Sequence, residues 1–251
     1  DIDYRLAREF NGLALQWPVG GGPIDYDVLA SDDGLRWQLL RQVRGSDGGF
    51  DALWLPEQEA RHLRIRRLRG GGQPKVELRT AAQWPSFNAV LAALAAAATR
   101  GDMPRAFVGE QNYWTLVGVD GGGDRSALLS EDGAIEVGRG GWSVEPSVRL
   151  EDGTQVTWAQ AVMTHSLRER SLPIPAAHWK HAAFTLDIEA AADGSRDGPK
   201  LLARYVLRNT GDRARTFVLT LTVRPWQVNP PQQFLSTQGG AAPIRSLRYG
   251  F

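Results

Sequence analysis

The chain has no cysteine among its 251 residues, which excludes disulfide scaffolds, cysteine nucleophiles and thiolate metal sites. It also lacks an excess of charge of either sign, because 29 Lys and Arg stand against 28 Asp and Glu. Binding to a nucleic-acid backbone relies on a dense basic field, so we expect no nucleic-acid partner. No run of about 20 apolar residues occurs, so we expect no membrane-spanning segment.

None of the common catalytic motifs occurs where a predicted strand leads into a helix. There is no GxSxG nucleophile elbow, HExxH zinc motif, phosphate-binding GxxxxGK or dinucleotide-binding GxGxxG. His178 and His181 stand three apart without a nearby carboxylate to complete a ligand set, so we expect neither to bind a metal. We therefore predict no catalytic residue in this chain, no metal and no cofactor.

Turn-forming residues are abundant. The chain contains 28 Gly, 14 Pro and seven Asp-Gly dipeptides, and Asp-Gly suits tight hairpin turns because both residues tolerate positive φ. Strand-like runs flank most of these turns, which predicts a mainly β fold. One helix is predicted over residues 86–100, with Ser86 as N-cap, Val90 and Leu94 on one face, and Gly101 just past its end.

The helix divides the chain into two β regions. Residues 1–80 contain short strands, including predicted strands at 52–55 and 62–68, and residues 81–103 form a linker with the helix. Residues 104–251 contain longer strands, which predicts large antiparallel sheets. Five arginines between residues 61 and 69 alternate with Leu63, Ile65 and Leu68 as in a half-buried strand. We interpret them as a solvated strand face, with an anion-binding patch as the alternative.

The clearest strand covers residues 216–223, with Leu219 and Leu221 on one face and Thr220 and Thr222 on the other. A turn at residues 209–212 predicts a hairpin between this strand and residues 205–208. The following segment, 224–234, contains three prolines and cannot pair regularly, so we expect an irregular loop.

Residues 26–37 read YDVLASDDGLRW, and residues 61–66 read RHLRIR. Both segments resemble strands of the discoidin, or coagulation factor 5/8 type C, family of galactose-binding-like β-sandwiches. Residues 12–15 are similar to the preceding strand of that family, and the resemblance covers about residues 1–80. It implies a partial discoidin-like β-sandwich, a type of module that binds sugars or lipid headgroups through loops at one end or acts as a spacer.

The second β region carries segments at 104–118, 129–136, 142–146 and 209–231 that look like a β-supersandwich. Such a domain precedes an (α/α)6 catalytic barrel in bacterial glucoamylase-like and debranching-like hydrolases and in disaccharide phosphorylases. Their catalytic acids lie in the helical barrel. The resemblance implies that this chain is part of a larger protein and packs on an (α/α)6 catalytic domain.

We therefore expect a non-catalytic carbohydrate-binding or structural region of a larger bacterial glycoside hydrolase or phosphorylase. Its expected ligand is an oligo- or polysaccharide, and a secreted or periplasmic location is favoured. Two alternatives stay open. The chain could be a self-contained glycosidase that uses carboxylates such as Glu110 and Glu145, or an adhesion module that recognises protein or lipid.

Tryptophan is the residue type most suited to sugar binding here, because a flat indole ring stacks on the C–H face of a pyranose. The candidates are Trp17, Trp37, Trp54, Trp114, Trp142, Trp158, Trp179 and Trp226. Trp179 and Trp226 are favoured among them, since Pro and polar residues interrupt the strand pattern around both. Gln227 and Asn229 complete the predicted site by bonding to hydroxyl groups. In the alternative interpretation, the tryptophans pack in cores and the proline-rich loop contacts the catalytic barrel.

Overall fold

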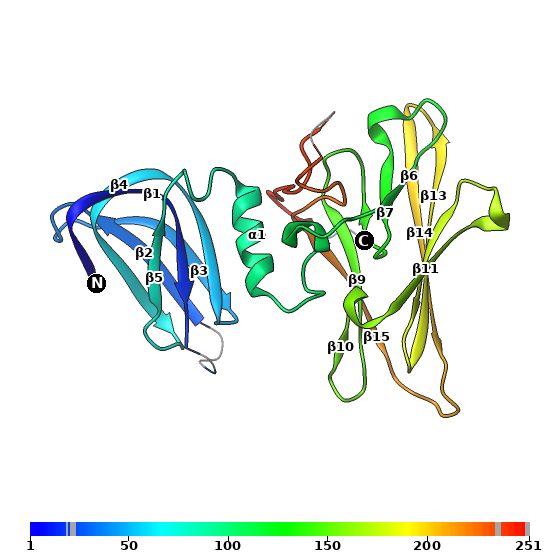
Figure 1. Cartoon of the computed structure of the whole chain (residues 1–251), viewed down its shortest axis with the longest axis horizontal. Coiled ribbons are helices and arrows are strands. Elements are labelled where there is room, and N and C mark those ends of the chain that lie inside the picture. Colours follow the sequence, from blue (N-terminus) through cyan, green and yellow to red (C-terminus); the bar gives the residue numbers. More distant parts are fainter. Residues whose placement is uncertain (19, 21–23, 234–236, 249–251) are drawn as a thin grey trace. The chain divides into compact units, whose positions relative to one another are not determined.

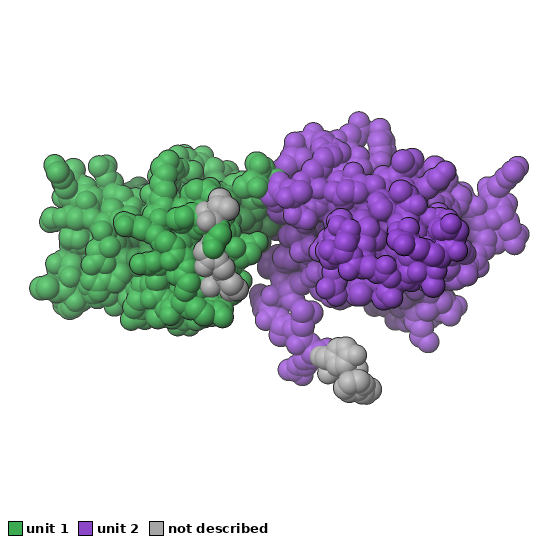
Figure 2. Space-filling model, turned by 90° about the horizontal axis from the view of Figure 1, so that it is seen from below, with its two compact units in different colours: residues 1–97 green, residues 98–251 purple. Residues whose placement is uncertain are grey.

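The computed structural model describes residues 1–18, 20, 24–233 and 237–248. It confirms the mainly β prediction, with antiparallel strands in three sheets and one short α-helix. The chain divides into two compact units, residues 1–97 and 98–251, and this division falls inside the predicted linker (Figure 2). Among the described residues, no helix is long and apolar enough to cross a membrane.

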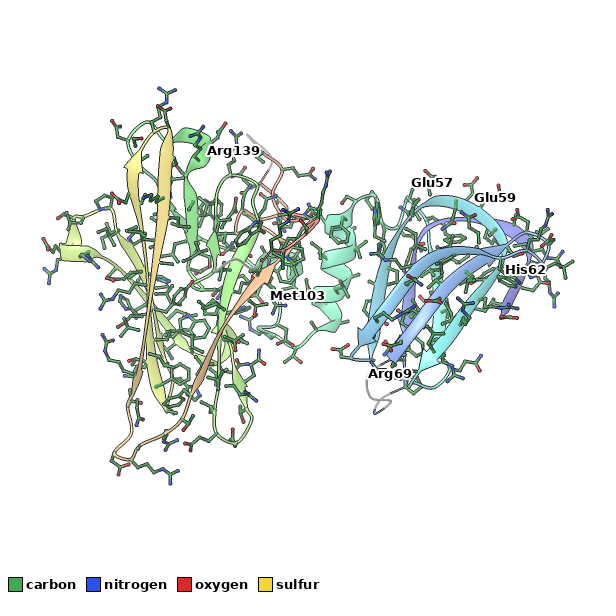
Figure 3. The ribbon with its side chains drawn as sticks, turned by 180° about the vertical axis from the view of Figure 1, so that it is seen from behind. Glu57, Glu59, His62, Arg69, Met103 and Arg139 are labelled. Atoms are coloured by element: carbon green, nitrogen blue, oxygen red, sulfur yellow. The ribbon has the colours of Figure 1, made fainter. Side chains whose placement is uncertain are left out.

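Unit 1 contains a five-stranded antiparallel sheet in the order β3-β2-β4-β1-β5 (Figure 1). Its strands are β1 (Ile2–Gln16), β2 (Ile24–Ser31), β3 (Gln38–Ser46), β4 (Phe50–Arg69) and β5 (Lys75–Arg79). The predicted strands 52–55 and 62–68 are the two ends of β4. The sequence does not indicate one continuous strand, because the mostly polar residues 56–61 interrupt the hydrophobic alternation while the backbone stays extended. Glu57, Glu59 and His62 follow the bend of β4 in Figure 3.

The core of unit 1 forms where β1, β2 and β4 bring their apolar side chains to one face. Trp17, Tyr26 and Leu63 are almost completely buried there. The polar ends of two of these side chains converge on one carboxylate. Trp17 Nε1 and the Tyr26 hydroxyl both donate to Asp51 Oδ2, at 2.8 and 2.7 Å. Both aromatic polar atoms are therefore satisfied within the core.

The arginines of β4 lie on a solvated strand face, as the alternation predicts, and each of four has an acidic partner. The pairs are Arg61–Asp3, Arg64–Asp1, Arg66–Asp27 and Arg69–Asp25. Between these arginines, Leu63 is buried and Ile65 packs against the core. Because acidic side chains of the same unit pair with these four arginines, this face offers little unbalanced positive charge to an anionic ligand.

The predicted helix is confirmed as α1 (Phe87–Ala97), three residues shorter at its C-terminal end. It covers the opposite face of the sheet from the core. Val90 of α1 packs with Ala14 and Trp84, and Ala14 points away from its neighbours Leu13 and Leu15 as strand alternation requires. The helix therefore belongs to unit 1.

Unit 2 is built from two antiparallel sheets (Figure 1). The larger sheet has the order β10-β9-β8-β7-β6, and β15 also pairs with β9. Its strands are β6 (Trp114–Val117), β7 (Ala127–Ser130), β8 (Ile135–Glu136), β9 (Ser143–Arg149), β10 (Gln155–Val156) and β15 (Val218–Arg224). The second sheet contains β11 (Val162–Leu167), β12 (Pro175–Lys180), β13 (Phe184–Ser195) and β14 (Gly198–Asn209). Four single-turn 3-10 helices join them: η1 (Arg105–Val108), η2 (Gly123–Arg125), η3 (Trp158–Gln160) and η4 (Arg168–Arg170).

The core of unit 2 lies between the two sheets, so this unit is a β-sandwich. Phe184, Leu186 and Ile188 alternate along β13 and are fully buried against the larger sheet. That sheet contributes, among others, Leu129 and Val148. Side chains fill the space between the sheets in Figure 3.

The predicted hairpin between residues 205–208 and 216–223 is wrong. Residues 205–208 lie in β14 and pair with β13, whereas β15 crosses to the other sheet and pairs with β9. The predicted division of this strand into two faces is nevertheless confirmed in its pairing with β9. Leu219 lies opposite Val148 towards the core, and Thr222 lies opposite Glu145 on the other face. Alternation defines faces but does not identify the neighbouring strand.

Candidate functional site

Trp179 lies in a regular strand, in contrast to the irregular segment that we expected around it. Pro175 begins β12, a position where proline is tolerated, and Trp179 points into the core with 1% of its surface exposed. Its Nε1 donates to the carbonyl of Asp132 at 3.1 Å. Gly133 follows in the turn with φ +87°, so one predicted Asp-Gly turn packs directly over this indole.

Trp226 is also buried, with 6% exposed, and follows the end of β15. Its Nε1 donates to Glu145 Oε1 at 2.5 Å, and its ring meets Phe107 edge-on at 6.1 Å. Arg224 lies over the indole at 5.3 Å. These contacts attach the proline-rich segment to the outer face of the larger sheet.

Gln227 and Asn229 use their amide groups to shape the same segment. Gln227 Nε2 donates to the carbonyls of Gln238 and Ala241, both at 3.1 Å. Asn229 Nδ2 donates to the Thr237 carbonyl at 3.3 Å, and its backbone N–H donates to Glu136 at 2.9 Å. The segment is irregular, as expected. Phe234, the last residue of the predicted loop, lies outside the described residues.

The four predicted sugar-binding residues thus form two groups. Trp226, Gln227 and Asn229 lie together on one segment, whereas Trp179 comes from the opposite sheet. Trp179 and Gln227 nevertheless line one small cavity together. Both indole N–H groups and both amide N–H groups bond within the protein, so these contacts stabilise the fold. Sugar binding by these four residues stays a prediction.

The small cavity has a volume of about 40 Å³ and is lined by Glu145, Arg224 and Gln227, among others. Burial raises the pKa of Glu145 to about 7, against the opposing effect of the Trp226 N–H and of Arg224. Arg224 Nε lies 3.6 Å from Glu145 Oε2, and Gln227 Oε1 has no protein partner. The volume suits a few water molecules bridging these atoms, and it is too small for a pyranose ring.

Glu110 occupies a different place in unit 2. It forms an ion pair with Arg100 and lines an open cleft of about 360 Å³. It is not among the residues that line the Glu145 cavity. A glycosidase needs two carboxylates on either side of one sugar. These two carboxylates do not share a cleft among the described residues.

A chain of hydrogen bonds crosses the outer face of the four-stranded sheet. Ser166 Oγ lies 2.8 Å from His178 Nε2, and His178 Nδ1 lies 2.7 Å from Asp187 Oδ1. Asp187 also pairs with Arg208. Among the described residues, no group of three or more His, Asp or Glu side chains is arranged to hold a metal ion.

Trp114 is the aromatic residue placed most favourably for a ligand. It is partly exposed at the start of β6, the edge strand of the larger sheet, and it lines three open clefts of about 600, 360 and 330 Å³. Tyr113, beside it, is 60% exposed and lines the largest cleft. Trp114 was one of the eight tryptophans considered from the sequence, but Trp179 and Trp226 were favoured over it, and Tyr113 was not a candidate. The signal was available, because adjacent aromatics in a strand point to opposite faces and cannot both enter one core.

No protein-family model matches this chain, and no curated protein sequence matches it either. The findings therefore define a mainly antiparallel β protein with three sheets and identify no family.

Proposed function

We propose that this chain is a non-catalytic, carbohydrate-binding region of a larger carbohydrate-active enzyme. The observation that carries the proposal is the meeting of three open clefts at Trp114, with the exposed ring of Tyr113 beside it. Exposed aromatic rings flanked by a few polar groups are the common means of binding a sugar ring.

The surroundings of Glu145 support a non-catalytic role over the glycosidase alternative. Its cavity admits water and no sugar ring, and Glu110 lines another cleft. The proposal also includes the finer expectations from the sequence. These are a discoidin-like identity for unit 1, a supersandwich identity for unit 2, an (α/α)6 catalytic domain as partner, no nucleic-acid partner and a location outside the cytoplasm.

Affinity electrophoresis of the whole chain through native gels that contain glucan, xylan or galactan tests the proposal. We expect retardation by at least one polysaccharide and no turnover of aryl glycosides. Turnover that Glu145→Gln abolishes would establish the glycosidase instead. Unchanged mobility in every gel, together with binding to anionic vesicles, would establish the interaction module.

A second candidate function, acyl-ester hydrolysis at Ser166, is favoured by the Ser166–His178–Asp187 hydrogen bonds. Their order is that of a nucleophile, a general base and an orienting carboxylate. It ranks second because the three side chains lie on an open sheet face and Asp187 is shared with Arg208. A fluorophosphonate probe should label Ser166 in the wild type and spare the His178→Ala variant if this candidate is correct. Equal labelling of both, or none, rejects it.

A further inference from the structure

We infer that the largest of the three clefts at Trp114 binds a neutral oligosaccharide of more than one sugar unit, with one ring stacked on Tyr113 and the chain continuing across Trp114. This inference rests on the proposed function and names its site and ligand class. The cleft measures about 600 Å³, within the range of small-molecule sites. It is lined by β6 and β7 of one sheet and by the ends of β11 and β12 of the other.

The two aromatic rings offer the ligand two successive stacking surfaces rather than one. Tyr113 directly precedes β6 and Trp114 begins it, so the two rings come from neighbouring positions of the chain. Of the three clefts, Tyr113 lines only the largest, whereas Trp114 lines all three. A ligand stacked on Tyr113 therefore reaches the next cleft by crossing Trp114, which requires several linked sugar rings.

Polar groups beside Tyr113 are oriented for sugar hydroxyls. His165 lies with Nε2 2.8 Å from the backbone carbonyl of Glu131, and a carbonyl can only accept. The Nε2 atom therefore carries the proton, and Nδ1 of the neutral ring is left as an acceptor. The Glu131 carboxylate accepts the Tyr113 N–H at 3.1 Å through one oxygen and has further lone pairs. Two acceptors therefore stand beside an aromatic platform.

The charge of the cleft selects against acidic sugars. No lysine or arginine is among its described lining residues, whose one carboxylate is that of Glu131. Arg105 lies outside this lining, with Nε 3.8 Å from Glu131 Oε1. A uronate in the cleft would therefore meet the Glu131 carboxylate and find no guanidinium or ammonium partner among the lining residues. A neutral sugar carries no charge to be repelled by Glu131.

The smaller cleft that contains Glu110 supplies side-chain amides for the rest of the chain. Its lining includes Gln111 and Asn112 from the segment before β6, and Gln232 from the proline-rich segment. Asn112 Nδ2 donates to the Val228 carbonyl at 2.9 Å, and Gln232 Nε2 donates to the Ala106 carbonyl at 3.0 Å. These bonds fix both amides and leave their carbonyl oxygens to accept hydroxyl groups.

A peptide that adds a strand to the edge of the sheet is the competing occupant. β6 has only four residues, so it offers an added strand few backbone hydrogen bonds. The exposed rings and fixed acceptors favour the oligosaccharide.

Isothermal titration of the whole chain tests this inference. The probes are cello-, laminari-, malto- and xylohexaose, with glucose and hexagalacturonate for comparison. We expect at least one neutral hexaose to bind more tightly than glucose and hexagalacturonate. Tyr113→Ala and Trp114→Ala should each weaken that binding at least about tenfold. Trp142→Ala is the matched control, because Trp142 is 36% exposed and lines none of these clefts.

The outcomes separate the site from the function. If Tyr113→Ala and Trp114→Ala both still bind the hexaose, the assignment of the site to this cleft is wrong, and the proposed function stands. Tighter binding of hexagalacturonate, or of glucose, would overturn the ligand class. No binding of any saccharide would overturn the proposed function together with this inference. Tyr113→Ala keeps the test decisive even if Trp114→Ala fails to fold, because the Tyr113 ring is 60% exposed.

Discussion

Glu145 carries its carboxylate beneath the proline-rich segment on the outer face of the larger sheet, where the Trp226 N–H donates to it and Arg224 Nε lies 3.6 Å away. Burial disfavours the charged form, and it outweighs the Trp226 hydrogen bond and the positive charge of Arg224, so the pKa rises from 4.5 to about 7. The segment after β15 is attached through this carboxylate. Its protonation is therefore coupled to the stability of unit 2.

The raised pKa predicts that unit 2 loses stability as the pH rises. The folded state holds the proton of Glu145 between about pH 4.5 and 7, whereas the unfolded state releases it, so the free energy of unfolding falls across that interval. The loss should be about 3 kcal/mol by pH 8. Glu145→Gln stays neutral and can still accept from Trp226, so it should be more stable than the wild type at pH 8.

Urea unfolding of both proteins at pH 5 and pH 8 checks this prediction. The difference in unfolding free energy between them isolates Glu145, because all other titrating groups are shared. A difference that does not change between the two pH values would show that burial of Glu145 leaves its pKa near 4.5.

Single residues also show how far the candidate site could be predicted. Alternation correctly assigned Thr220 and Thr222 to one face of β15. It could not show that Trp226 is covered, because the contacts that bury it come from Glu145 and Phe107, 81 and 119 positions earlier in the chain. Trp114 was a candidate that was not favoured, for the converse reason. Its strand lies at a sheet edge, and sequence alternation does not distinguish an edge strand from a central one.

At the scale of elements, turns were predicted better than pairings. Asp132 and Gly133 form a tight turn between β7 and β8, with Gly133 in the left-handed region. β12 was missed because its residues, Pro-Ala-Ala-His-Trp-Lys, show little apolar alternation. It exists because its neighbours β11 and β13 pair with both of its edges. Long-range pairing of this kind is not encoded in a local pattern.

The turn at Gly133 predicts a specific cost for adding a side chain. An alanine Cβ would meet Ile188 Cδ1 in the core and would also adopt φ +87°. Gly153→Ala is the matched control, because Gly153 has φ +86° and open space around its Cβ position. We expect about 1–2 kcal/mol of destabilisation for Gly153→Ala from the backbone alone, and about 1–3 kcal/mol more for Gly133→Ala from overpacking.

Thermal or urea unfolding of the two alanine variants measures these costs. Equal destabilisation of both would mean that Ile188 moves aside freely, and that the turn does not pack tightly over the core.

At the scale of the whole molecule, the two units have separate cores. Leu63 is 1% exposed in the core of unit 1, and Ile188 is fully buried in the core of unit 2. Composition and turn frequency correctly predicted a mainly β protein with one short helix. They could not assign the helix to unit 1, because that depends on the packing of Val90 against Ala14 and Trp84.

Separate cores predict two unfolding transitions in calorimetry. Leu63→Ala should lower the midpoint of one transition and Ile188→Ala that of the other, each with a loss of about 2–5 kcal/mol from the unit concerned. A single transition that both substitutions shift equally would show that the units unfold as one.

We propose that carbohydrate is bound at the partly exposed Trp114 and not at the buried Trp226. Titration of the whole chain with its best neutral hexaose, in parallel with Trp114→Ala and Trp226→Phe, measures this directly. Phe keeps a six-membered aromatic ring at position 226 and removes the pyrrole part of the indole, including the N–H bonded to Glu145. We expect Trp226→Phe to bind within about twofold of the wild type and Trp114→Ala to bind at least about tenfold more weakly. Weakened binding in Trp226→Phe with unchanged binding in Trp114→Ala would contradict the account.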